Sequence, residues 1–173
     1  MDYYIPDMYQ KSIYHIDYDK LYEDGIRCLL FDLDNTCVSY NDKEPNKKLK
    51  ELFDSLKEDG FKVIIFSNAS KKRLLPFKKY LNVDCSASSR KPFKKKFLKI
   101  LKLFKFDLHE VAIIGDQLFT DVYGGNKVGI KTILVNPMSK NDAFYTKFFR
   151  LLEIRAYRRL KKRDILVKGR YYE

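Results

Sequence analysis

The chain has 173 residues, 45% of them hydrophobic and 15% aromatic, which suits one domain with a full core and argues against disorder. Lysine and arginine outnumber aspartate and glutamate by 35 to 23, and the formal net charge of +12 favours an anionic partner or surface. The first residues have neither a basic flank nor an apolar stretch, and no apolar run approaches the roughly 20 residues that span a membrane, so we expect neither a signal peptide nor a transmembrane helix. Three cysteines in no metal-binding spacing are expected as reduced thiols of a cytoplasmic protein, namely Cys28, Cys37 and Cys85.

The first part of the chain leads into a buried strand and an amphipathic helix. Residues 1–26 are a tyrosine-rich lead-in, and four consecutive apolar residues at 28–31 predict a strand covered on both faces. A helix is predicted to open at Pro45 and to close at Gly60. Lead-in residues expected to pack beside the first strand are Ile13, Ile16 and Leu21. The predicted helix face consists of Leu49, Leu52, Phe53 and Leu56.

The same alternation continues along the chain. A strand at 63–66 precedes a helix at 71–81, in which Pro76 is expected to kink the helix or delay its start. A short strand near 83–86 and a helix around 97–104 follow. The face of that helix consists of Phe97, Ile100, Leu101 and Phe104, and two further strands are predicted at 111–114 and 132–135.

Alternating strands and helices imply right-handed crossovers and a parallel sheet. We therefore predict an α/β fold, a Rossmann-like three-layer sandwich with a mainly parallel sheet and no large cap domain. The chain is expected to form a single domain over 1–173, with its core at 26–137 and a basic, amphipathic helical tail at about 141–163.

Polar residues gather where the predicted strands end. Asp32 and Asp34 directly follow the first strand, and if the chain is still extended there, their side chains point the same way. Two such carboxylates repel unless a cation neutralises them or one takes up a proton. Later strand ends carry Ser67, Asn68, Lys91, Asp116 and Asp121. Each residue alone is consistent with a turn, a helix N-cap or solvated surface, but parallel strands bring them to one sheet edge, where such folds carry their chemistry.

The order and spacing of these residues resemble the four motifs of the haloacid dehalogenase-like phosphatase superfamily, over about residues 28–136. The motifs are Asp-x-Asp-x-Thr from Asp32 to Thr36, Ser67, Lys91 within Arg-Lys-Pro, and Gly115-Asp116 with Asp121. The strings Phe-Asp-Leu-Asp-Asn-Thr and Gly-Asp-Gln-x-x-Thr-Asp are similar, more narrowly, to the YqeG-type branch of subfamily IIIA and to the soluble phosphatidylglycerophosphate phosphatases. Cys37 departs from the family, which usually has a larger aliphatic residue there, and this affects packing more than chemistry.

The resemblance implies a phosphomonoester hydrolase that works through an aspartyl-phosphate. Asp32 would be the nucleophile, and Asp34 would protonate the leaving oxygen and then deprotonate the attacking water. Lys91 would supply a positive charge for the nucleophile and the equatorial phosphoryl oxygens. Mg²⁺ would be held by the side chains of Asp32 and Asp116 and by the backbone carbonyl of Asp34.

The resemblance also assigns the remaining polar residues and the substrate. Ser67, Asn68 and Thr36 are expected to bind the phosphoryl group, and Thr36 also to fix the turn that holds both acids. Asp121 would lie behind the metal ligands and orient the metal's waters or Lys91. The narrower resemblance, together with the open site and the basic tail described below, favours a bulky or membrane-borne phosphomonoester such as phosphatidylglycerophosphate as the substrate, while a phosphatase of nucleic-acid ends or nucleotides stays open as the alternative.

Receiver domains of phosphorelay signalling are a different class that also places acids, a hydroxyl and a lysine at strand ends with Mg²⁺. Their residues fall on successive strands in another order. Here Asp32 and Asp34 share one strand end, and Asp121 follows Lys91. This arrangement favours the phosphatase over a non-enzymatic protein that accepts a phosphoryl group or binds nucleic acid.

The motif spacing leaves no room for an inserted cap domain. Only 35 positions separate Asp32 from Ser67, and 24 separate Ser67 from Lys91, each filled by roughly one helix and its connections. We therefore expect an open site that a bulky substrate or a surface completes, and poor activity on small sugar phosphates.

The segment 147–163 carries eight basic residues against one acid, Glu153. Its apolar helical face consists of Phe144, Phe148, Leu151 and Leu152, widened by Tyr145, Phe149, Ala156 and Leu160. The tail is either a helix packed on the sheet with a solvated basic face or an interfacial helix on an anionic bilayer, which would make the protein peripheral at the membrane and bring the site to a lipid headgroup. Nucleic acid is the competing anion.

Overall fold

The computed structural model describes residues 3–173 and contains one six-stranded sheet. The strands are β1 (Met8–Gln10), β2 (Cys28–Phe31), β3 (Lys62–Phe66), β4 (Asp84–Ser86), β5 (Val111–Gly115) and β6 (Lys131–Val135). Their order is β1-β6-β5-β2-β3-β4, and every neighbouring pair is parallel. The expected absence of a signal peptide concerns in part residues 1 and 2, which lie outside the described residues.

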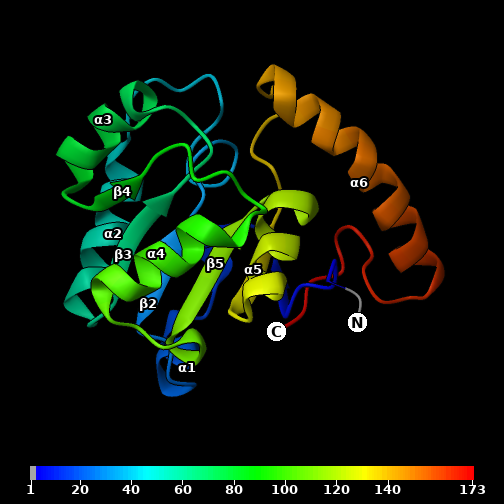
Figure 1. The fold of residues 1–173 in the computed structure, drawn as a ribbon, viewed down its shortest axis with the longest axis horizontal. Coiled ribbons are helices and arrows are strands. Elements are labelled where there is room, and N and C mark those ends of the chain that lie inside the picture. The colour runs from blue at the N-terminus through cyan, green and yellow to red at the C-terminus, as the bar shows by residue number, and fades with distance from the viewer. Residues whose placement is uncertain (1–2) are drawn as a thin grey trace.

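Helices cover both faces of this sheet (Figure 1). They are α1 (Tyr18–Glu23), α2 (Lys47–Glu58), α3 (Lys71–Leu81), α4 (Lys94–Phe104), α5 (Tyr123–Val128) and α6 (Phe144–Lys162), with 3-10 turns η1 (Ile13–His15) and η2 (Leu108–Glu110) and a π-helical turn η3 (Leu118–Val122). One apolar cluster joins α1, α2 and α3 to one face, and a second joins α4 and α5 to the other. The predicted three-layer α/β fold is therefore confirmed.

Local capping explains where two helices begin. Asn46 accepts a hydrogen bond from the backbone N–H of Leu49, so α2 begins at Lys47 and not at Pro45 as predicted. Ser70 caps α3 in the same way, and this helix begins at Lys71 with Pro76 inside it, so its start is not delayed.

The lead-in contributes more than packing. Ile13, Ile16 and Leu21 are buried in the cluster of the first face, as expected, but the lead-in also supplies the edge strand β1, which the sequence analysis missed. β1 lies beside β6 on one side and pairs through Tyr9 with Tyr172 on the other. Both ends of the described chain therefore meet at one edge of the sheet.

The helix α5 was also missed, because its sequence is rich in glycine. A Cβ added at Gly125 would lie 2.6 Å from side-chain atoms of both Ile113 and Thr132. Only a glycine lets the helix approach β5 and β6 this closely. The two glycines that weaken the sequence signal for a helix are thus what allows it to pack.

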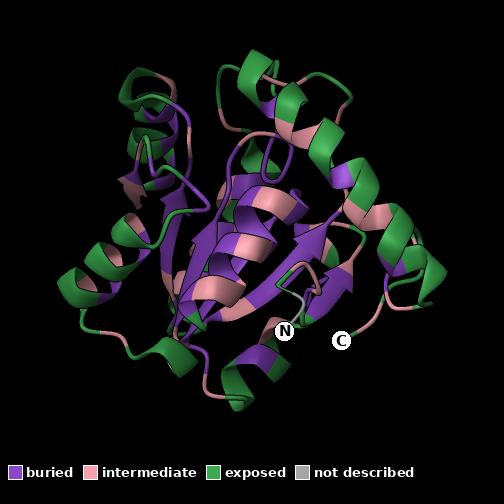
Figure 2. Cartoon of the chain, turned by 45° about the vertical axis from the view of Figure 1, so that its right-hand side comes forward, coloured by how far each residue is buried: buried purple, intermediate pink, exposed green. Residues whose placement is uncertain are grey.

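The helix α6 lies along the β1 and β6 side of the molecule, apart from the other helices (Figure 1). Its packed face carries Thr146, Glu153 and Leu160, which are buried. Part of the face predicted as apolar points outward, since Phe144, Phe148 and Leu151 are 91%, 61% and 64% exposed, whereas Leu160 in its widened part is buried. Figure 2 shows this exposure along the helix.

We call this the outer face of α6 and define it by Phe144, Phe148 and Leu151 in the first half and Arg155, Arg158, Arg159 and Lys162 in the second. It is apolar in one half and basic in the other. Within residues 3–173, no helix combines the length and the hydropathy needed to cross a bilayer.

Candidate active site

The ends of β2, β3 and β5 bring the predicted motifs together at one edge of the sheet. Phe31 pairs with Ile65 on one side and with Ile114 on the other, so the residues after these three strands are neighbours. The backbone N–H of Asp32 still donates to the carbonyl of Ile114, at 2.9 Å. Asp32 therefore leaves the strand in a fixed position.

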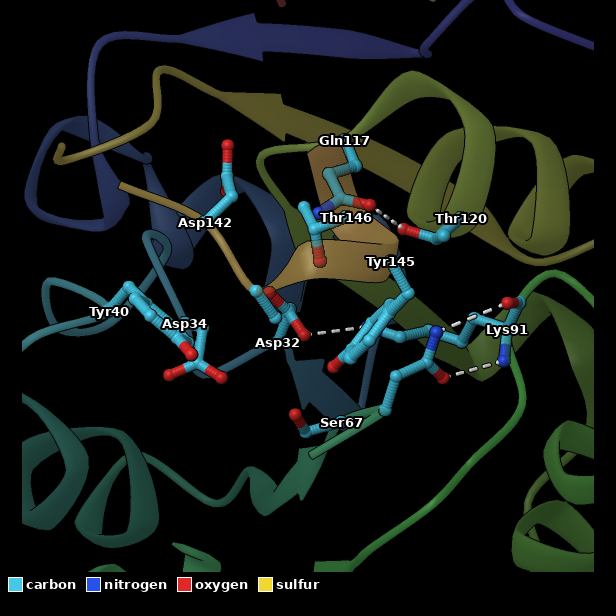
Figure 3. Close-up of a pocket in the computed structure, with 12 residues that line it drawn as sticks. Asp32, Asp34, Tyr40, Ser67, Lys91, Gln117, Thr120, Asp142, Tyr145 and Thr146 are labelled. Carbon is cyan, nitrogen blue, oxygen red and sulfur yellow. Dashed lines mark hydrogen bonds and ion pairs between the residues drawn. The ribbon is translucent and has the colours of Figure 1, made fainter. Parts of the chain in front are cut away.

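Lys91 lies between the carboxylates of Asp32 and Asp121, and Figure 3 shows it beside Asp32. Its Nζ is 2.8 Å from Asp32 Oδ1 and 2.6 Å from Asp121 Oδ1, and its side chain is 1% exposed. Asn68 holds the lysine's backbone, since its amide accepts from Lys91 N–H at 2.7 Å and donates to Lys91 C=O at 3.2 Å. The lysine charge is thus fixed against the predicted nucleophile.

Asp121 reaches this position because β5 ends in a glycine. A Cβ at Gly115 would lie 2.1 Å from the Asp121 carboxyl group, so any other residue there would displace the acid. Asp121 Oδ2 also accepts the backbone N–H of Gln117, at 3.2 Å. Both oxygens of Asp121 are therefore used, one by Lys91 and one by the turn after β5.

Three buried carboxylates form a group that fits a divalent cation. Asp32, Asp116 and Asp121 each offer an oxygen, and these atoms lie within 4.8 Å of one another. The hydroxyl of Thr36 lies 3.0 Å from Asp116 Oδ1 and 3.3 Å from Asp32 Oδ2 and ties these two acids together. Carboxylate oxygens are hard donors, which suit Mg²⁺.

Asp34 points away from this group and toward α3. Its Oδ1 is 2.8 Å from Arg73 Nη2 and 3.2 Å from Arg73 Nε. Its side chain is absent from the carboxylate group, which is compatible with the expected ligand being its backbone carbonyl. Arg73 was missed in the sequence, because a basic residue at the third position of a helix carries no signal of its partner.

Two of the three predicted phosphate-binding residues, Ser67 and Asn68, line the pocket, and their side chains already have partners. Ser67 Oγ accepts the backbone N–H of Ala69, at 3.1 Å, and the Asn68 amide is used on Lys91. Thr36 bridges the acids and does not line the pocket. In this arrangement the donors left for a phosphoryl group are the Ser67 hydroxyl proton and the second amide proton of Asn68.

Arg150 of α6 is the largest addition that the structure makes to the site. Its guanidinium forms an ion pair with Asp116 Oδ2, and its Nη1 donates to the Asp116 carbonyl at 3.0 Å. Glu153 supports it, since this buried acid lies 3.4 Å from Arg150 Nη1 and accepts the backbone N–H of Phe119 at 2.9 Å. The sequence analysis counted both residues only as charges of the tail.

The start of α6 and the segment before it cover the pocket. Asp142, Ala143, Tyr145 and Thr146 line it together with the strand-end residues, and Figure 3 shows the Tyr145 ring reaching in beside Asp32 and Lys91. The remaining cavity is about 20 Å³, room for about one water. The site is not open as expected, although no domain is inserted between the motifs within residues 3–173.

Asn35 attaches this covering segment to the loop after β2. Its amide nitrogen donates to the carbonyl of Asn141 at 2.7 Å and to Asp142 Oδ1 at 3.0 Å. The backbone of Asn35 has φ 63°, a left-handed conformation that asparagine tolerates better than most residues. A residue inside the first motif thus holds the cover in place.

Burial raises the pKa of Asp116 to about 8 and that of Asp121 to about 6, because a buried carboxylate loses its hydration. The charges of Arg150 and Lys91 act in the opposite direction on Asp116 and Asp121 respectively. The acid cluster is therefore short of positive charge in the absence of a divalent cation.

The other titratable groups of the site are held by their partners. Burial opposes the charge on Lys91, but Asp121 and Asp32 raise the pKa of the ammonium overall, so the lysine is charged. Burial raises the pKa of Asp34, while its hydrogen bond from Arg73 lowers it. The pKa of Asp34 is thus raised overall, with burial as the largest cause.

Comparison with known proteins gives consistent matches. The sequence model of the haloacid dehalogenase-like hydrolases matches residues 6–129. The probable phosphatase YqeG of Bacillus subtilis (strain 168) is 37% identical, over 93% of this chain and 94% of its own length. Phosphatidylglycerophosphate phosphatase 1, chloroplastic/mitochondrial, of Arabidopsis thaliana is 25% identical over 93% of this chain, which spans 49% of that longer protein.

Solved structures agree on the fold. The crystal structure of 3-deoxy-D-manno-octulosonate 8-phosphate phosphatase from Moraxella catarrhalis, in complex with magnesium and phosphate, aligns with a TM-score of 0.53 at 17% identity. The alignment covers 70% of this chain and 76% of that one.

Proposed function

The chain belongs to the haloacid dehalogenase-like hydrolase family and is a phosphatase of that family, and from this premise we propose that it hydrolyses phosphomonoesters through an aspartyl-phosphate on Asp32. The observation that carries the proposal is the buried contact of 2.8 Å between Lys91 Nζ and Asp32 Oδ1 at the closed end of the pocket. A carboxylate held by a fixed ammonium keeps its charge and its direction, which a nucleophile requires.

The cation of the reaction is proposed to be Mg²⁺. Asp32 and Asp116 would hold it with their side chains and Asp34 with its backbone carbonyl, and Asp121 would support Lys91. When bound, the cation supplies positive charge that lets one anion approach another. The buried carboxylate group formed by Asp32, Asp116 and Asp121 supports this proposal.

The chain's own residues account for the bonds and protons. Asp32 attacks phosphorus, the bond from phosphorus to the alcohol oxygen breaks, and Asp34 gives its proton to that oxygen. Asp34 then takes a proton from water, and the resulting hydroxide oxygen attacks the phosphoryl group and frees Asp32. Lys91 remains charged throughout and faces the phosphoryl oxygens together with Ser67.

The proposed substrate is a membrane-borne phosphomonoester such as phosphatidylglycerophosphate. The name of the relative from Arabidopsis thaliana supports this choice, and so does the outer face of α6. Exposed phenylalanine and leucine side chains suit the headgroup region of a bilayer, and each basic residue near an anionic surface adds about 1 kcal/mol. The protein is accordingly proposed to be peripheral at the membrane.

The test is hydrolysis by the purified protein with Mg²⁺ and a set of phosphomonoesters. The set comprises phosphatidylglycerophosphate in vesicles, nucleotides, 5′- and 3′-phosphorylated oligonucleotides, small sugar phosphates and a soluble chromogenic phosphate. We expect the highest kcat/KM for the lipid and low values for sugar phosphates. Preference for nucleotides or oligonucleotide ends would replace the lipid by the alternative substrate class.

Two variants test the mechanism in the same assay. Asp32→Asn should abolish turnover and prevent trapping of a phosphoryl group on the protein, whereas Asp34→Asn should slow turnover with the fold intact. The exposed Asp59→Asn serves as the matched control. Hydrolysis near the wild-type rate in Asp32→Asn would show that the nucleophile is another group.

A further inference from the structure

The pocket and Asp116 are blocked by the same helix. Tyr145 and Thr146 in the first turn of α6 line the pocket, whose volume is about 20 Å³, room for about one water. Further along, Arg150 of α6 contacts Asp116 through both its carboxylate and its carbonyl. The first half of α6 therefore contacts both the substrate pocket and the Asp116 carboxylate.

Both carboxylate oxygens of Asp116 already have a partner in this arrangement. Thr36 donates to Oδ1 at 3.0 Å, and the Arg150 guanidinium is paired with Oδ2. A divalent cation on Asp116 would lie next to the guanidinium, and like charges at such a distance in a buried site repel strongly. The ion pair with Arg150 and a bound divalent cation are thus alternatives for the same carboxylate.

The two halves of α6 are held to the molecule differently. Leu160 in the second half is buried in an apolar cluster with Tyr9 and Leu134. The first half exposes most of its apolar side chains and is held by polar contacts and by the stack of Phe149 on Phe119, with ring centroids 4.9 Å apart. Local opening of the first half would therefore leave the apolar contacts of the second half intact.

We infer that residues 141–152 form a lid over the active site, that Arg150 is the positioning residue which holds the lid closed on Asp116, and that binding of a divalent cation opens it. The inference rests on the proposed function for the identity of Asp116 as a cation ligand. Coupling of this kind is reciprocal: a cation that binds the open state better shifts the lid toward that state, and a weaker lid contact strengthens cation binding.

The reciprocity gives two measurements that need no substrate. In hydrogen exchange on the full chain, saturating Mg²⁺ should speed exchange of the amides at 147–152 about tenfold and leave those at 156–162 unchanged. In calorimetric titration with Mg²⁺, Arg150→Gln should bind about tenfold more tightly than wild type. Arg155→Gln removes the same charge from the outer face of α6 and should bind like wild type.

Arg150→Lys is a second variant. It retains the charge but cannot contact both the carboxylate and the carbonyl of Asp116, so its affinity for Mg²⁺ should lie between those of wild type and Arg150→Gln. The exchange measurement on the wild-type chain keeps the test decisive even if a variant fails to fold. The inference is overturned if exchange at 147–152 does not respond to Mg²⁺, if Arg150→Gln and Arg155→Gln have equal affinities, or if no Mg²⁺ binds.

Failure of the lid and failure of the proposed function give different results. A protein that hydrolyses phosphomonoesters without the exchange response retains the function and loses the lid. A protein that shows the coupling in both measurements but hydrolyses no phosphomonoester retains the lid and loses the function.

Discussion

At the scale of single residues, the site depends on one buried lysine that serves two acids. Lys91 is paired with Asp32 and Asp121, and all three side chains are nearly inaccessible. Removing one partner of a buried ion pair costs far more than the pair itself contributes, because the remaining charge is left without water or a counter-charge. The same lysine is thus needed for charge in the reaction and for stability.

Lys91→Met should lower the free energy of unfolding by about 3–5 kcal/mol, since it leaves Asp32 and Asp121 together without their cation. Urea denaturation followed by circular dichroism measures the change, with the exposed Lys72→Met of α3 as control. An unchanged urea midpoint in Lys91→Met would contradict this prediction. It would show that protonation of Asp32 or Asp121 replaces the lysine charge without loss of stability.

The sequence predicted this level of the structure only in part. Asp32, Lys91, Asp116 and Asp121 could be placed at one sheet edge because each follows a strand or lies in a motif of known order. The sequence could not place three other residues of the site, because their partners lie far away along the chain. The separations are 39 residues for Arg73, 34 for Arg150 and 106 for Asn35. Such contacts depend on how helices and loops pack in the folded protein, and a local sequence pattern does not predict that packing.

At the scale of elements, the strands that are uniformly buried could be predicted from the sequence. β2, β3 and β5 were found because a strand covered on both faces is a continuous apolar run. β1 was missed because three edge residues among tyrosines give no such run, and the glycines of α5 hid a helix. The helix α6 was predicted, but its aromatic residues lie on more than one side of it. The periodicity of its apolar residues therefore did not show which face packs against the sheet.

The outer face of α6 gives a prediction at this scale. The chain has no tryptophan, so Phe148→Trp introduces a single reporter on that face. Its emission should shift to shorter wavelength with vesicles containing phosphatidylglycerol and not with neutral vesicles, and the shift should weaken at high salt because the attraction is screened.

The matched control for this measurement is Leu103→Trp, which places the reporter on an exposed position of α4. Equal shifts at positions 103 and 148 would show that the protein does not bind through α6. A response to DNA or RNA without a response to vesicles would assign the basic half of the outer face to nucleic acid.

At the scale of the whole molecule, the acid cluster makes stability depend on pH and on divalent cations. The raised pKa values of Asp116 and Asp121, about 8 and about 6, mean that the folded protein keeps protons that the unfolded chain has already released. This contribution is fully present below pH about 4 and is lost as the pH rises through 6 and 8.

We therefore expect the cation-free protein to be less stable at pH 8 than at pH 5, measured by urea denaturation with EDTA present. Mg²⁺ should stabilise the protein more at pH 8 than at pH 5, because it binds the deprotonated cluster of the folded state. Asp116→Asn should flatten both dependences. Higher stability at pH 8 than at pH 5 in EDTA would show that the folded cluster is already ionised at low pH.

The pairing of Tyr9 with Tyr172 bears on how α6 can move. Tyr9 N–H donates to Tyr172 C=O at 2.8 Å, and Tyr172 N–H donates back at 2.9 Å. The stretch 136–171 therefore leaves the sheet at β6 and returns to it beside the adjacent strand β1. It is attached to the sheet at both of its ends. The pairing of Tyr172 with Tyr9, together with the buried Leu160, therefore restricts how far α6 can move. Removing Tyr172 would abolish the second attachment and allow α6 to move further. It would also leave β1 as an unpaired edge strand that can pair with a strand of another molecule.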